Sequence, residues 1–258
     1  MFDRLTLQGA AGIPGGGSLQ VRVLLAAAIA AGFAGLAGCT DSASHAPSGS
    51  ATGMTGMKMG KAAGMFSAGR LGGALLTRVN GVGPAGRVAE GSYASLPEVR
   101  EAAKSMAALL VTPRGCGQPT SVGGFGLGGM PGSAPAAVVT FRVGPNGVSE
   151  VLAAPAGSAA SAALGAPVPA WCTHYAATSS GKTYQYAVQQ SWVTGIGKQA
   201  RMLNVSPVGQ ARANVWSLVY RGDGFVGAIT IVGPNASAAA VRELGQQAYA
   251  YAAKSLAK

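Results

Sequence analysis

The chain has few charged residues, and acidic ones are the scarcest. Its 258 residues include 8 Asp and Glu against 19 Lys and Arg, so the formal net charge is +11 and only 10% of the residues are charged. A general acid and base pair needs two carboxylates that converge on one cleft, and this composition offers few candidates. The basic residues stand singly instead of in a run with aromatic residues, so we also expect no nucleic-acid partner.

Motifs for metals, cofactors and covalent catalysis are also lacking. The sequence contains neither Cys-x-x-Cys, nor His-Glu-x-x-His, nor Gly-x-Ser-x-Gly, so we expect no metal and no cofactor. Residues 176–183 end in Gly181-Lys182-Thr183 but begin with Ala176, where a phosphate loop requires glycine. Taken together, these absences favour a protein that is not an enzyme.

Long apolar runs are missing too, and the longest one lies near the N-terminus. Residues 23–37 carry no charge, follow Arg22 and give way to polar residues from Thr40 onward. This run is too short to span a bilayer, which takes roughly 20 apolar residues. The order of basic residue, apolar core and small residues is typical of an export signal. We therefore predict a signal peptide over residues 1–38, with translation starting at Met1 or Val21.

The predicted signal peptide is followed at once by a cysteine. Leu36, Ala37, Gly38 and Cys39 stand at the end of the apolar run, and together they resemble the lipobox of bacterial lipoproteins. The resemblance implies cleavage before Cys39 and a diacylglyceryl thioether on its sulfur. It also implies an extracytoplasmic protein anchored to the cell membrane, with the lipid bilayer as its partner. The 41 glycines and 14 prolines are typical of a GC-rich bacterial genome, such as that of an actinobacterium.

The remaining two cysteines fit the same compartment. Once Cys39 is lipidated, Cys116 and Cys172 are the only thiols left. Outside the cytoplasm such a pair normally forms a disulfide, which we predict here. A zinc site built from these two thiols and His174 is the less favoured alternative.

The rest of the chain divides into a tether and one domain. Residues 39–91 are rich in Ala, Gly, Ser and Met without a sustained period, so we predict a lipidated, flexible tether. Residues 92–258 begin with a helix over 96–110 and close with one that runs to about Leu256. Between them, apolar runs bounded by turns predict strands, at 137–143, 148–152, 184–193, 200–205, 215–220 and 225–232.

These elements predict an α+β domain. We expect an antiparallel sheet of about five strands, with the N-terminal helix and the long C-terminal helix packed on one face, and one disulfide. Trp171, Trp192 and Trp216 are expected in the core or on a sheet face.

A second resemblance concerns this domain. Its first helix ends in Leu-Leu-Val-Thr-Pro at 109–113. Cys116 and the Cys172 of Trp171-Cys172 form the predicted disulfide pair, and a hairpin followed by a helix closes the chain. This layout resembles extracytoplasmic sensor-like domains of actinobacterial lipoproteins and receptor serine/threonine kinases, although the chain has no kinase and one cysteine pair where those domains usually have more. The resemblance implies a noncatalytic, monomeric domain that binds an apolar or anionic envelope ligand. The alternatives are a cell-envelope hydrolase with an unrecognised active site and a structural surface protein.

Overall fold

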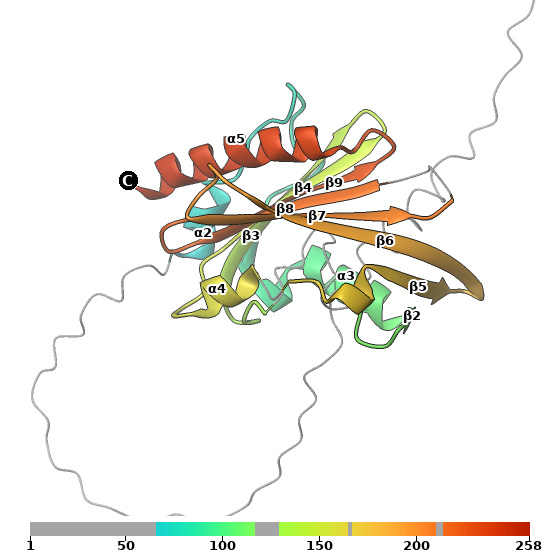
Figure 1. Ribbon diagram of the computed structural model, residues 1–258. Coiled ribbons are helices and arrows are strands. Elements are labelled where there is room, and N and C mark those ends of the chain that lie inside the picture. Colours follow the sequence, from blue (N-terminus) through green and yellow to red (C-terminus); the bar gives the residue numbers. More distant parts are fainter. Residues whose placement is uncertain (1–65, 117–128, 165–166, 210–213) are drawn as a thin grey trace, which may run out of the picture.

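The computed structural model describes residues 66–116, 129–164, 167–209 and 214–258 (Figure 1). The predicted signal peptide, the lipobox and Cys39 lie outside these residues, as do 39–65 of the predicted tether. Nine strands form one sheet in the order β1-β3-β4-β9-β8-β7-β6-β5-β2, and each neighbouring pair is antiparallel. The strands are β1 (Ala89–Ser92), β2 (Leu110–Thr112), β3 (Pro135–Val143), β4 (Asn146–Ala153), β5 (His174–Ser179), β6 (Lys182–Val193), β7 (Gln199–Pro207), β8 (Asn214–Arg221) and β9 (Val226–Gly233).

The helices lie on both sides of this sheet (Figure 1). They are α2 (Ala68–Gly72), α3 (Pro97–Ala107), α4 (Ala159–Ala163) and α5 (Ala238–Leu256), with short 3-10 turns at Tyr93–Ser95 and Ala170–Cys172. The N-terminus of α5 is capped by Ser237, whose side chain accepts a hydrogen bond from the Ala240 amide. Such a cap satisfies one of the amides that the first helical turn leaves without a partner.

Side chains of a strand alternate between the two faces of a sheet, and the buried residues sort accordingly. On the first face, α2 and α5 cover one continuous apolar cluster, to which the strands contribute residues such as Val148, Leu152, Leu218 and Ile229. The second face carries two clusters. One lies under α3 and includes Val138, Val151, Val219 and Val226, and the other surrounds Cys116 and Cys172. Every residue of β9 is buried, because this central strand is covered on both faces.

The prediction of about five strands is wrong. The structure adds β1, β2 and β5 to the strands that the sequence indicates. β1 and β2 have only four and three residues, and β5 (His-Tyr-Ala-Ala-Thr-Ser) contains few residues with a strong strand preference. Pairing with β3, β5 and β6 brings them into the sheet, and the sequence of a short segment does not reveal such partners.

The prediction that the N-terminal and C-terminal helices pack on one face is also wrong. Val99 and Ala102 of α3 belong to the second-face cluster, whereas α5 packs on the first face. The helix that joins α5 there is α2, within residues 66–91 that we assigned to the tether. Leu71 of α2 and Leu75 after it are 0% and 2% exposed, so these residues are part of the folded region.

Candidate ligand-binding face

A row of hydroxyl side chains crosses the second face of the sheet. Thr140 on β3 is paired with Ser149 on β4, Ser149 with Thr230 on β9, and Thr230 with Ser217 on β8. Residues directly opposite each other in antiparallel strands lie on the same face, so the four side chains form one line. Ser217 Oγ lies 2.6 Å from Thr230 Oγ1, so a hydrogen bond joins the last two residues at the β8 end of the line. We call these four residues the hydroxyl row.

The hydroxyl row separates the two apolar clusters of the second face. Two residues further along each strand lie Val151, Ala228 and Val219 on one side. On the other side are Val232 and Val215. Ser149, Thr230 and Ser217 are buried, and the row ends at β8, because the residue paired with Ser217 on β7 is the buried Leu203. The second face therefore has a polar floor between two apolar strips.

Charge is distributed unequally between the two faces. Among the described strands, the acidic residues are Glu90 and Glu150. They lie on the first face, since Glu90 pairs with Ala137 of its cluster and Glu150 shares its side of β4 with Val148 and Leu152. Three arginines of the strands lie on the second face. Arg201 is paired with Val219 and Arg221 with Val226, and Arg142 lies two residues after Thr140 on β3. The sheet thus presents guanidinium groups on the second face and carboxyl groups on the first.

Arg201 lies where a ligand would meet both a charge and an apolar surface. Arg201 on β7 is paired with Trp192 on β6 and with Val219 on β8. Burial lowers the pKa of the Arg201 guanidinium from its ordinary value, although an arginine remains charged at neutral pH. Trp192 is 55% exposed. The half-buried Arg201 and the exposed Trp192 therefore lie side by side on the second face, next to Val219 of the cluster under α3.

Arg221 and Glu98 each bring a buried polar atom to this side of the sheet. Arg221 Nη1 donates a hydrogen bond to Oγ of Ser161 on α4 at 2.5 Å. Its Nε, like Oε2 of Glu98 on α3, is buried and has no hydrogen-bond partner among the described residues. A buried polar atom without a partner costs about 1–3 kcal/mol, so a ligand that supplies partners gains that free energy.

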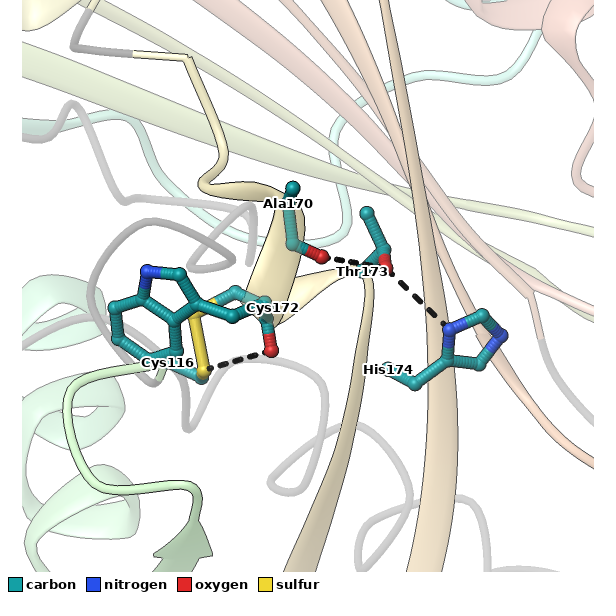
Figure 2. The surroundings of a disulfide bond; sticks show 6 residues. Cys116, Ala170, Cys172, Thr173 and His174 are labelled. Carbon is teal, nitrogen blue, oxygen red and sulfur yellow. Dashed lines mark hydrogen bonds between the residues drawn. A yellow bond between two sulfur atoms is a disulfide. The ribbon is translucent and has the colours of Figure 1, made fainter.

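The predicted disulfide is present at the far end of the second face. Cys116 and Cys172 are bonded, and both are fully buried. The rings of Tyr175 and Tyr186 stack in the same cluster with centroids 5.2 Å apart. Figure 2 shows Thr173 next to the bond, where its hydroxyl donates to the Ala170 carbonyl at 2.8 Å. The disulfide therefore ties the segment before β5 to the end of β2.

His174 opens β5, two residues after the disulfide-bonded Cys172. Its ring is exposed, and Nδ1 lies 3.4 Å from the Thr173 hydroxyl (Figure 2). In the part of the chain that the structure describes, no three His, Cys, Asp or Glu side chains are close enough to hold a metal ion. Within those same residues, no helix has the length and apolar character needed to cross a bilayer.

The tryptophans correct another expectation. Trp216 packs against the first-face cluster and Trp192 lies on the second sheet face, as expected, although Trp192 is 55% exposed; Trp171 lies instead in the 3-10 turn before β5 and is 57% exposed. Sequence reasoning also missed the hydroxyl row. Each of Ser149, Ser217 and Thr230 is a lone hydroxyl within an apolar strand, which is a visible cue. Their alignment depends on strand register, which the sequence does not show.

The first face holds a buried acid. Glu150 is 0% exposed, and its Oε2 accepts a hydrogen bond from the Leu76 amide at 2.7 Å. Its Oε1 and the Tyr220 hydroxyl have no hydrogen-bond partner among the described residues. Burial raises the pKa of Glu150 to about 8, against the opposing effect of the Leu76 hydrogen bond. The carboxyl group is therefore mostly protonated at neutral pH.

Comparison with known proteins yields structural similarity at low identity. No family model and no curated protein matches the sequence. The extracellular domain of PknH from Mycobacterium tuberculosis is 14% identical, with a TM-score of 0.48 over 75% of this chain and 98% of that chain. A putative uncharacterized protein from Mycobacterium smegmatis is 14% identical, with a TM-score of 0.31 over 58% of this chain and 75% of that chain. Similarities at this level do not assign a function.

Proposed function

We propose that this protein is a membrane-anchored, noncatalytic lipoprotein of the cell envelope whose second face binds an anionic amphiphile. The anchor would be the acylated Cys39, with Leu36, Ala37 and Gly38 as the recognition residues before it. The Cys116–Cys172 disulfide supports an extracytoplasmic location, since such bonds persist in oxidising compartments.

The unequal charge of the two faces carries the ligand proposal. Arginine forms bidentate hydrogen bonds with carboxylates and phosphates, and Arg201 places such a group beside exposed Trp192. The exposed Trp192 ring offers contact to hydrocarbon, whereas the apolar strips on either side of the hydroxyl row are buried. Ligand sites commonly combine an apolar lining with a few fixed polar groups. An acidic headgroup with an acyl chain matches both parts.

The anchor is tested by metabolic labelling with a palmitate analogue in the native host. The full chain should carry the label and remain with the membrane fraction, and Cys39→Ser should lose the label and leave the membrane. Cys172→Ser is the matched control, because it removes a thiol without touching the predicted lipobox. An unlabelled wild-type chain, or a label retained by Cys39→Ser, would contradict the anchor.

The ligand is tested by calorimetric titration of the detergent-purified full chain with a short-chain phosphatidic acid and with the matching phosphatidylcholine. We expect binding of the anionic lipid alone. Arg201→Gln should weaken it about tenfold to a hundredfold, the usual value of a charge-assisted hydrogen bond. Arg242→Gln is the control, since it removes the same charge from an exposed position of α5. Equal binding of both lipids, or equal weakening by both substitutions, would refute the proposal.

A further inference from the structure

A small cavity lies on the first face, away from the arginines described above. It has a volume of about 100 Å³, and its walls come from α5, from both sides of the β3–β4 turn, from β9 and the segment after it, and from the turn around Asn80. Drug-sized ligands occupy pockets of roughly 300 Å³ or more, so this one suits a single small ring or the end unit of a longer molecule.

Neutral amides dominate the polar lining of this cavity. Asn80, Asn146 and Asn235 come from three separate segments, and α5 adds Glu243 and Gln247 one turn apart. The apolar part of the lining comes from Val143, Val148, Ile231 and Leu244 among others. The cavity therefore combines an apolar wall with groups that can both donate and accept hydrogen bonds.

Three of the polar side chains have partners before any ligand arrives. Asn146 Oδ1 accepts a hydrogen bond from the backbone N–H of Asn235 at 3.2 Å. A Cβ at position 233 would lie 2.2 Å from that same oxygen, so Gly233 leaves the space that the Asn146 side chain occupies. On α5, Gln247 Nε2 donates to Glu243 Oε1 at 3.4 Å. Preorganised groups of this kind lower the entropic cost of binding.

From this lining we propose that the cavity is a second binding site, which takes one neutral sugar ring. A hydroxyl group donates and accepts, as a carboxamide does, so a polyol can satisfy several amides at once. The C–H face of a sugar ring matches the apolar wall. Glu243 is the charged side chain in the lining and repels an anion.

The test is saturation-transfer NMR on the detergent-purified full chain with methyl α-mannopyranoside, methyl α-glucopyranoside and N-acetylglucosamine. At least one of them should show transfer to its ring protons. Gln247→Leu should weaken binding roughly threefold to tenfold through the lost hydrogen bonds. Gln246→Leu is the matched control, because Gln246 is the exposed neighbour on α5 and is absent from the lining.

Two outcomes would overturn the sugar site: absence of transfer from all three probes, or equal weakening by Gln246→Leu and Gln247→Leu. Arg201→Gln should leave sugar binding unchanged, because Arg201 lies on the second face. The phosphatidic acid titration reports on that face alone, so failure of one proposal is distinguishable from failure of the other.

Discussion

The two faces of the sheet differ in how their apolar layers are built. The first face has one continuous apolar cluster under the 19 residues of α5, and it buries Glu150 in a protonated form. The second face has two clusters that the hydroxyl row separates, and its helices, α3 and α4, have 11 and 5 residues. A continuous apolar layer contributes most to stability. A layer divided by buried hydroxyl groups, such as the hydrogen-bonded Ser217 and Thr230, buries less apolar surface and stabilises less.

The largest expected effect concerns the buried acid of the first face. The pKa of Glu150 is raised from 4.5 to about 8, so the folded state holds a proton that the unfolded state releases between these values. The contribution of this group to stability is full below pH 4.5 and is lost as the pH rises to about 8. At 1.36 kcal/mol per pKa unit, the loss is about 5 kcal/mol at most. Urea unfolding at a series of pH values measures it.

Glu150→Gln isolates this effect, because glutamine has the same shape and does not ionise. We expect the variant to lose most of the decline in unfolding free energy between about pH 5 and pH 8. Tyr220 on β8 is a buried titratable group on the same side, and burial raises the pKa of its hydroxyl well above the ordinary value, so it does not ionise in this pH range. Glu90→Gln, on the same face but exposed, is the control. A wild-type chain with equal stability at both ends of this range would contradict the prediction.

Removing the disulfide of the second face should lower the free energy of unfolding by a smaller amount. The cysteines are 56 residues apart, and closing a loop of that length contributes about 4 kcal/mol in the chain-entropy model. The double variant Cys116→Ser/Cys172→Ser should lose this amount in denaturant unfolding. Hydrogen exchange should accelerate first in β5 and β6, which carry Tyr175 and Tyr186 of the disulfide cluster. Earlier acceleration in α5 and β9 would show that the two faces do not differ in this way.

Sequence patterns revealed the long elements and missed what depends on register. β8, β9 and α5 were predictable because their periodicity extends over 8 to 19 residues. α2 was missed because it is a five-residue helix within an Ala/Gly-rich segment, stabilised by burial of Leu71. The disulfide was predictable from cysteine count and compartment, whereas the charge difference between faces was not. Strand pairing decides on which face of the sheet Arg201 and Glu150 lie, and a single strand's sequence does not contain that information.

The smallest expected effect concerns the hydroxyl row itself. Ser217→Ala leaves the buried Thr230 hydroxyl without its hydrogen bond, which should cost about 1–3 kcal/mol. The double variant Ser217→Ala/Thr230→Val should cost less, since it removes both partners of this hydrogen bond and changes the side-chain volumes little. The double variant would also join the two second-face clusters into one, as on the first face. If the row serves binding, this stable variant should bind phosphatidic acid more weakly while urea unfolding is almost unchanged. A double variant that loses more stability than Ser217→Ala would instead assign the row a structural role.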